Sequence, residues 1–521
     1  MALLLLTVGT AHAWIQFQPP PAATNRGVSA APLLRTTLLW THRSTRVRLM
    51  AEKLTVPECA DSCPPEETST LELIRFVVPT VGGWISSEMM SVIDTAIVGS
   101  GSATELAALG PATMLTDSGA YLFFWLNVAT TSLFATALAA GKTGEAYDTL
   151  SDALWCALAC GIFMTLVMAF FGRSLLVAIC SSAPEVVPAA YKYLSIRLLG
   201  LPAFMAGMVL QAACLGARDS LSPLIVLVSS GLLNLVLDIY LVTKLGMGIG
   251  GAAWATLASQ LLQTALLAFI VQRKRAKAGA GDSWLLVRPG LPEPKRLLKF
   301  VTFAGPIFLV LLGKISCYNA MTLGATANGI VALAAHQAMI SVFFLGCKFG
   351  DAISQTSQTY LPACYDPGAD GAAARPPARA QRLSARLLRL STVLGAIVSL
   401  LAFAFITRLP TIFTRDIAVL SAMRGCAPLL FVALLLHATC MCCEGLLLGS
   451  RELKFLSKAY IANVGVFLSA LYMITQRRLG LQAVWKALAA FQLVRIITFA
   501  LRLRTVGLAF TRDADAAERE E

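Results

Sequence analysis

The sequence has few charged side chains. Asp, Glu, Lys and Arg make up 14% of its 521 residues, whereas soluble domains carry about 25%. Hydrophobic residues make up 57%, and the mean hydropathy is +0.70. This shortage of charge excludes a soluble enzyme and places most of the chain in lipid.

Groups that catalyse reactions or bind metals are also scarce. Of the four histidines, His12 and His42 lie near the N-terminus, while His336 and His437 have no acidic partner at a metal-ligand spacing. The thirteen cysteines show no metal-ligand or disulfide framework. An intramembrane enzyme is therefore a remote alternative, and we expect neither a metal site nor a prosthetic cofactor.

Acidic side chains are absent from residues 14–50, which contain several Arg, Ser and Thr residues. Residues 1–13 form a short apolar run that ends in a small-x-small cleavage pattern. Together, residues 1–50 resemble the two-part leaders of plastid proteins and predict a multi-pass protein of the plastid envelope. The alternative is plain secretory entry, with a location in another endomembrane or the plasma membrane. Residues 51–70, rich in Pro and Glu, predict a flexible segment.

The net charge of +13 does not indicate a nucleic-acid partner, because the cations lie in short loops between apolar runs. Such loops set membrane topology, with the basic side facing the cytosol or its equivalent. The most basic loops, 272–299, 375–389 and 451–458, fall on the side of both termini. We therefore expect both termini to face the stroma, or the cytosol if the leader is misassigned.

Twelve apolar runs predict the fold. A membrane crossing needs about 20 apolar residues, so we expect an all-α polytopic membrane protein with about twelve transmembrane helices. An N-lobe (71–271) and a C-lobe (300–505) are joined by a basic inter-lobe loop (272–299), and a disordered tail follows (506–521). The runs lie near 73–98, 112–140, 152–171, 190–215, 221–243, 250–271, 300–325, 331–361, 387–407, 417–449, 455–475 and 481–503.

The two six-helix halves repeat each other. When the sequence is shifted by 227 residues, Pro79 falls on Pro306 and Leu106 falls on Leu333. At a different offset, Gly216-Ala217-Arg218 matches Gly449-Ser450-Arg451. Ordered agreement of this kind indicates duplication. Because each half has an even number of crossings, the pseudo-twofold axis runs along the membrane normal, with a cavity between the lobes.

Inserting an ionisable group into the membrane within an apolar helix costs about 2.5–3.5 kcal/mol on insertion scales. Each such residue is therefore a candidate for a structural or functional role. Asp94 lies in the first run and Asp238 in the fifth. Asn234 shares a helical face with Asp238, and Thr256 of the sixth run can add a hydroxyl. These four residues predict a site for H+ or Na+, although each acid could instead cap a kink or bond a neighbouring helix.

Three further residues are candidates for substrate binding or coupling. Lys314 of the seventh run either reaches the membrane edge through its flexible stem or attracts an anionic substrate from inside the cavity. Glu444, near the end of the tenth run, has either a structural role or a role in coupling. Gln337, beside His336, supplies neutral hydrogen-bonding groups to the substrate or to another helix.

Several of these stretches resemble the multidrug and toxic compound extrusion (MATE) family, in particular its plant-type plastid-envelope branch. The resemblance covers about residues 72–505. It is carried by MMSVIDTAIVGSGSATELAALGPA around Asp94, by AAHQAM and ISQTSQTYLP in the second half, and by the Asn-x-x-x-Asp pair at 234 and 238. By position, Asp94, Asn234, Asp238 and Thr256 match the first-lobe cation site of the family.

The resemblance implies an antiporter that exports an organic metabolite or xenobiotic in exchange for H+ or Na+ by alternating access. It also places Glu444 where relatives often carry an acid, and Lys314 where the plastid branch carries a lysine. Lys314 favours an anionic substrate. We expect a monomer whose partners are membrane lipid and a small organic substrate. A flippase-like exporter of a lipid-linked or amphiphilic substrate is the alternative.

Overall fold

Helices are the only regular elements in the part of the chain that this computed structural model describes, residues 68–99, 103–180, 184–279, 294–365, 376–412 and 416–508. The expected leader (1–50), most of the flexible segment and of the tail, and the middle of the basic inter-lobe loop (280–293) lie outside these residues. From Thr70 onward the described residues belong to one compact unit.

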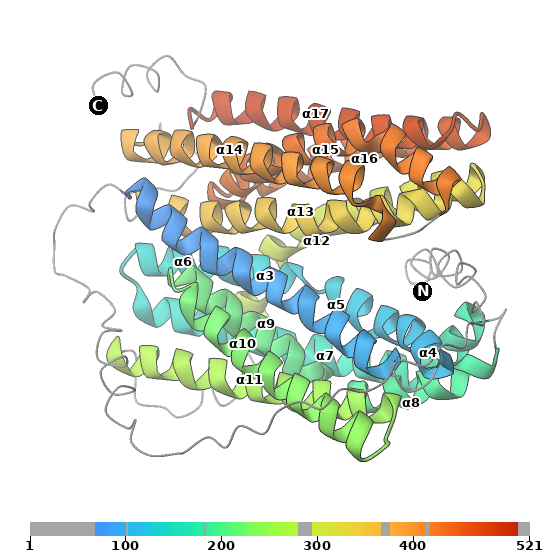
Figure 1. Cartoon of the computed structure of the whole chain (residues 1–521). Helices are drawn as coiled ribbons and strands as arrows, with labels where there is room; N and C mark the ends of the chain where they lie inside the picture. The colour runs from blue at the N-terminus through green and yellow to red at the C-terminus, as the bar shows by residue number, and fades with distance from the viewer. Residues whose placement is uncertain are drawn as a thin grey trace, which may run out of the picture. The chain divides into compact units, whose positions relative to one another are not determined.

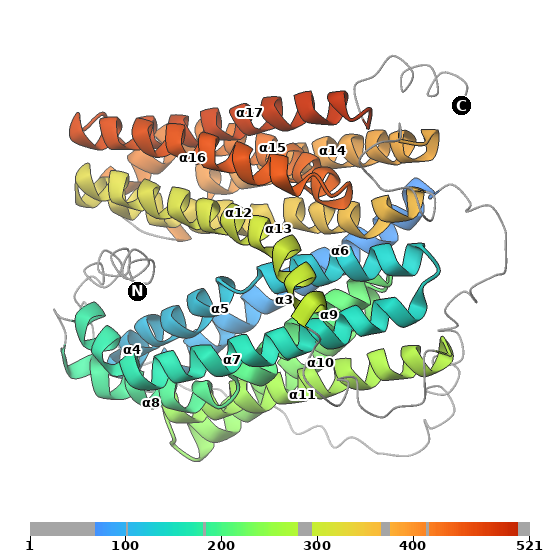
Figure 2. The same ribbon diagram turned by 180° about the vertical axis from the view of Figure 1, so that it is seen from behind.

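Helices α3 to α11 form the N-lobe and α12 to α17 form the C-lobe (Figures 1 and 2). The elements of the N-lobe are α3 (Thr70–Gly99), α4 (Ala103–Thr113), η1 (Met114–Ser118), α5 (Gly119–Tyr121), α6 (Trp125–Ala139), α7 (Thr143–Ile179), η2 (Pro184–Val186), α8 (Val187–Leu198), α9 (Leu201–Gly216), α10 (Leu221–Asp238), η3 (Ile239–Lys244) and α11 (Ile249–Lys277). Those of the C-lobe are α12 (Pro294–Ala327), α13 (Ile330–Tyr360), η4 (Leu361–Cys364), α14 (Ala378–Arg408), η5 (Pro410–Ile412), α15 (Ile417–Gly449), α16 (Leu453–Gln476) and α17 (Leu481–Thr505).

The number of membrane-spanning helices agrees with the prediction once α3 is considered. The described residues contain ten helices long and apolar enough to cross a membrane, or up to eleven if the bent pair Pro184–Leu198 and Leu201–Gly216 is one span. Helix α3, with 30 residues, is not among these and corresponds to the first expected crossing. The fold is therefore that of an all-α polytopic membrane protein.

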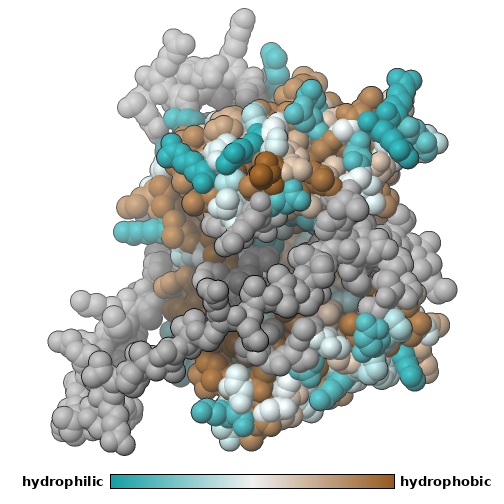
Figure 3. All heavy atoms as spheres, turned by 45° about the vertical axis from the view of Figure 1, so that its right-hand side comes forward, coloured by the Kyte–Doolittle hydropathy of each residue, from teal (hydrophilic) through white to brown (hydrophobic). Residues whose placement is uncertain are grey.

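Apolar side chains cover much of the outer surface, as expected for helices that face lipid. Phe170 is 77% exposed and Val466 is 68% exposed, although each lies in the middle of a long apolar helix. Figure 3 shows the resulting hydrophobic areas beside the polar clusters. A separate set of polar side chains is buried inside the protein.

The C-terminal half of α13 joins the two lobes through neutral hydrogen bonds and ring contacts, together with the Arg218 guanidinium, which lies 4.6 Å from the centre of the Tyr360 ring. Gln355 Nε2 donates to Thr131 Oγ1 of α6 at 3.1 Å, and Thr359 Oγ1 donates to the Leu215 carbonyl of α9 at 3.2 Å. The ring of Tyr360 meets the edge of Phe76 in α3, with centroids 5.4 Å apart. The polar run SQTSQT therefore serves here as an interhelical contact at the end of the lobes where α3 begins.

The internal repeat is visible in matched corners. Two residues after the last residue of α9 and of α15 lies an arginine with left-handed backbone, Arg218 (φ +60°) and Arg451 (φ +63°). The next residue in each case is an acid that pairs with a cation near the end of the lobe's last helix. Asp219 pairs with Lys274 of α11, and Glu452 pairs with Arg502 of α17 at 2.9 Å.

The Asp219 corner lies outside the spans and keeps its charge. Burial alone would raise the pKa of Asp219, but the charge of Lys274 and hydrogen bonds from Lys274 and Ser222 lower it below its usual value. The Ser222 amide donates to Asp219 Oδ1 at 2.9 Å, so the same carboxylate also holds the start of α10. Each lobe thus has an ion pair at the corresponding position, between the residue that follows the left-handed arginine and the lobe's last helix.

Close packing of α13 on α15 depends on glycine. A Cβ placed on Gly445 would lie 2.6 Å from the Ser354 carbonyl oxygen and 2.7 Å from its Cα. We expect Gly445→Ala to destabilise the protein by about 1–3 kcal/mol, because the two backbones must separate. Gly465→Ala is the matched control, since a Cβ there meets nothing within 4 Å. Thermal unfolding in detergent measures both; an unchanged midpoint for Gly445→Ala would contradict this packing.

Candidate functional site

The two predicted acids meet in the interior of the N-lobe. Asp94 comes from α3 and is half-buried, while Asp238 is the last residue of α10 and is fully buried. Their carboxyl groups lie within hydrogen-bonding reach of each other. The Oδ1 atom of each is buried and has no hydrogen-bond partner. The pair is therefore a buried acidic pocket with unused acceptor capacity.

Helical spacing positions the third predicted residue. Asn234 lies one turn before Asp238 on α10 and is 4% exposed. Its Nδ2 donates to Asp238 Oδ2 at 3.2 Å. The amide thus orients one carboxyl and leaves its own carbonyl oxygen for a further ligand.

Thr256 reaches this pocket through a tyrosine. Its hydroxyl donates to the Ala252 carbonyl in its own helix at 2.8 Å and lies close to the Tyr193 hydroxyl. Tyr193, buried on α8, is close enough to Asp94 to interact with it electrostatically. The four predicted residues and Tyr193 therefore surround one interior region.

Two charged residues of this region were missed by sequence reasoning. Arg197 of α8 is 6% exposed, and its Nη2 donates to Asp117 Oδ1 of η1 at 3.0 Å. The Asp117 side chain is 59% exposed. Both residues lie inside predicted apolar runs, 190–215 and 112–140, so the criterion that selected Asp94 could have selected them as well.

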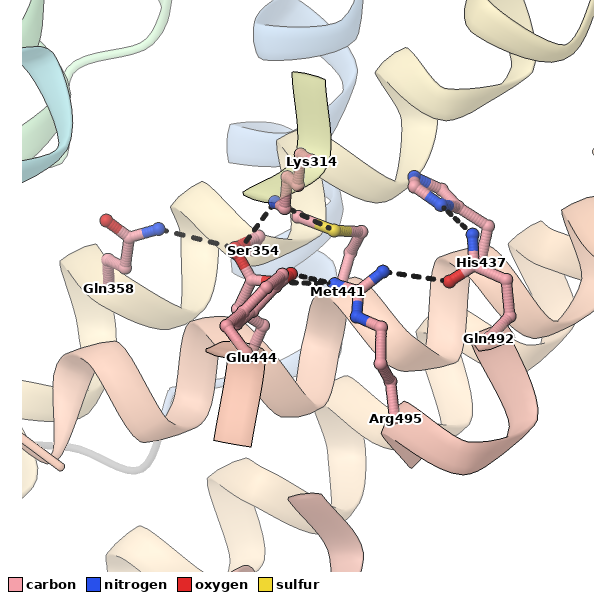
Figure 4. Close-up of polar contacts among 9 residues, drawn as sticks. Lys314, Ser354, Gln358, His437, Met441, Glu444, Gln492 and Arg495 are labelled. Carbon is pink, nitrogen blue, oxygen red and sulfur yellow. Dashed lines mark hydrogen bonds and ion pairs between the residues drawn. The ribbon is translucent and has the colours of Figure 1, made fainter. Parts of the chain in front are cut away.

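The C-lobe contains a second buried charge cluster, centred on Glu444 of α15 (Figure 4). Lys314 Nζ of α12 lies 2.8 Å from Glu444 Oε1, and Arg495 Nη2 of α17 lies 2.7 Å from Oε2. The Tyr460 hydroxyl of α16 also donates to Oε2. Lys314 therefore forms an interior ion pair and does not extend to the membrane edge. Arg495, which sequence reasoning missed, lies inside the run 481–503.

Neutral side chains extend this cluster. Arg495 Nη1 donates to Gln492 Oε1 at 2.9 Å, and Gln492 Nε2 lies 2.9 Å from His437 Nδ1 (Figure 4). One network thus crosses α12, α15, α16 and α17. Of its two cations, Lys314 has 14% of its side chain exposed and Arg495 has 1%. Lys314 is consequently the cation that a ligand can reach.

Gln337 lies away from this network. It is half-buried on α13, and its carbonyl accepts a hydrogen bond from Ser341 Oγ at 2.9 Å. Ser354, which lies in the network region (Figure 4), is about 25 Å farther along the same helix at 1.5 Å per residue. The neighbouring His336 lies 3.4 Å from Thr322, two turns beyond Lys314 on α12.

Two helical lobes, each with buried ionisable groups, define a polytopic membrane transporter. Solved transporters have the same fold. An outward-facing MATE family multidrug resistance transporter of the MOP superfamily matches with a TM-score of 0.72 at 19% identity, covering 85% of this chain and 99% of that one. A MOP superfamily transporter from Pyrococcus furiosus matches with a TM-score of 0.72 at 20% identity, covering 86% and 99%.

Sequence comparison identifies the family. The MatE family model matches residues 79–240. Protein DETOXIFICATION 47, chloroplastic, from Arabidopsis thaliana is 34% identical over 437 residues, 84% of this chain and 78% of that protein. DNA damage-inducible protein F from Escherichia coli is 26% identical and covers 83% and 92%. The chain belongs to the MATE family of efflux transporters, so it is a multi-pass membrane transporter and not an enzyme.

Proposed function

We propose that this transporter is a secondary active antiporter that exports an organic metabolite or xenobiotic in exchange for H+ or Na+ by alternating access. The meeting of Asp94, Asn234 and Asp238 in one buried pocket carries the proposal. Two adjacent buried carboxyl groups cannot both be charged without a cation. When the pocket changes the side of the membrane to which it opens, it can therefore bind or release that cation. Coupling to substrate transport can be no larger than the difference in affinity between the two facing states.

The C-lobe cluster supports an anionic substrate. Lys314 and Arg495 together exceed the charge of Glu444 by one positive charge. The partly exposed Lys314 can transfer one of its hydrogen bonds to a carboxylate, sulfonate or phosphate of the substrate. Gln337 would add a neutral hydrogen-bonding group farther along α13.

The contacts between the lobes suit a conformational change. Gln355 and Thr359 join the lobes by neutral hydrogen bonds, and each such bond contributes only about 0.5–1.5 kcal/mol net. Tyr360 adds ring packing and a contact with the guanidinium of Arg218, which is an exposed residue. Such contacts can open without exposing an unpaired buried charge. Rocking of the lobes would then expose the cavity to the opposite side of the membrane.

The plastid envelope is the proposed location. Two Arabidopsis relatives, Protein DETOXIFICATION 47 and Protein DETOXIFICATION 44, are both described as chloroplastic. Residues 1–50 have the composition of a two-part plastid leader. We propose that the protein acts there as a monomer, surrounded by membrane lipid.

Transport by the purified protein in lipid vesicles tests the function. We expect an imposed H+ or Na+ gradient to drive accumulation of carboxyfluorescein, an organic anion, and to drive ethidium, an organic cation, less strongly. Preloading with unlabelled substrate should accelerate uptake by counterflow, which a channel does not show. Uptake that follows only the substrate's own gradient would reject antiport, and a preference for ethidium would reject the anionic substrate.

A further inference from the structure

Arg197 is a buried cation with unused donors. Its Nη2 is bonded to Asp117, but Nε and Nη1 are buried and have no hydrogen-bond partner. A guanidinium has five N–H donors, and buried donors without acceptors are costly. The arrangement is therefore incomplete in this conformation, and another acceptor would complete it.

The matching acceptors belong to the acidic pocket. Asp94 Oδ1 and Asp238 Oδ1 are buried without partners, and the charges of Arg197 and Asp94 act on each other. Tyr193, one turn before Arg197 on α8, and Asp117 on η1 also interact with Arg197. The unused donors and the unused acceptors thus occur in the same region of the N-lobe.

We propose that Arg197 is the resident counter-ion of the Asp94–Asp238 pair and that it moves from Asp117 to the pair when the pair gives up its coupling cation. The inference deepens the proposed function, on which it rests. It assigns Arg197 as a positioning residue of the coupling site and Asp117 as its resting partner.

The difference in burial between the two partners supports this exchange. Asp117 is 59% exposed, so water can solvate its carboxylate when Arg197 leaves, and an exposed ion pair contributes little. The Asp94–Asp238 pair is mostly buried, and an ionised buried carboxylate without a counter-charge is strongly unfavourable. Arg197 is therefore needed most when the pair has no bound cation.

A resident guanidinium also selects the coupling ion. A hard metal cation requires several oxygen ligands with free lone pairs, and N–H donors aimed at the same oxygens occupy those lone pairs. A proton needs only one oxygen. With Arg197 in place, the pocket therefore suits H+ and does not suit Na+.

Sodium binding tests this assignment without relying on transport. Thermal unfolding of the purified full-length protein in detergent is compared in sodium chloride and in choline chloride of equal ionic strength. We expect no sodium-specific shift for wild type or Arg197→Lys. For Arg197→Gln, sodium should raise the midpoint by about 2 °C or more, because the pocket now lacks its counter-ion. Adding Asp94→Asn to Arg197→Gln should remove that response.

The outcomes separate this inference from the proposed function. Sodium stabilisation of wild type, or an absent response in folded Arg197→Gln, overturns the counter-ion role. If Arg197→Gln does not fold, the sodium response of the wild-type protein alone decides whether Arg197 has the counter-ion role. A sodium-stabilised wild type whose export still requires Asp94 and Asp238 keeps the antiport and rejects the role of Arg197. Gradient-driven export that survives without both acids rejects the antiport itself.

Discussion

We expect gradient-driven export to be lost when either Asp94 or Asp238 is replaced by Asn. The substitution keeps the shape of the side chain but removes the carboxyl group that we propose binds the coupling cation. Coupling between two sites of one protein is typically worth about 5- to 150-fold in affinity, and we expect this whole factor to disappear. The measurement is ion-driven accumulation in vesicles with equal amounts of wild type and variant.

Glu145→Gln is the control for this pair. Glu145 is exposed and forms a surface ion pair with Lys142 at 3.4 Å, so its neutralisation should leave coupled export unchanged. Size-exclusion profiles show whether each variant is folded. Full coupled export by Asp94→Asn or Asp238→Asn would mean that the acidic pocket is only structural.

Neutralising Glu444 has the largest expected effect on stability. Glu444→Gln leaves Lys314 and Arg495 buried without a counter-charge. Removing one partner of a buried ion pair costs about 3–5 kcal/mol, so we expect a large fall in the thermal unfolding midpoint in detergent. Replacing Lys314, Glu444 and Arg495 together with Met, Leu and Met should recover much of the loss, because no unpaired charge then remains.

Glu452→Gln provides the comparison for that experiment. Glu452 has 20% and its partner Arg502 has 37% of the side chain exposed, and exposed pairs contribute about 0–1 kcal/mol. If Glu444→Gln were no less stable than Glu452→Gln, the Glu444 cluster would not be holding the C-lobe together.

The fold was largely predictable because hydrocarbon imposes strict rules on sequence. Continuous apolar runs located the long helices, and basic loops separated them. Helix ends were less predictable: α14 begins at Ala378, although its apolar run begins near 387. Amphipathic and basic turns continue a helix beyond the membrane, and hydropathy does not register them. Residues 112–140 were expected as one run, and they do lie in one candidate span, Thr104–Ala139. The division of that span into α4, η1, α5 and α6 was not predicted.

The acidic pocket was predictable in part because Asn234 and Asp238 share one helix. Their geometry follows from helical periodicity, and the meeting with Asp94 was an expectation that the family resemblance implied. The partners of the cations were not predictable. Lys314 and Glu444 are 130 residues apart and Arg197 and Asp117 are 80 apart, and hydropathy contains no information on which distant charges meet.

The π-helical turn η1 affects how the two halves can be aligned. A π-turn holds one residue more than the α-turn it replaces, so side chains beyond it are rotated by about 100° relative to an unbroken helix. Thr131, which accepts the hydrogen bond of Gln355, lies beyond η1, whereas α13 runs without interruption. An alignment of the two halves must therefore allow for this additional residue of the first half before it pairs positions of α6 with positions of α13.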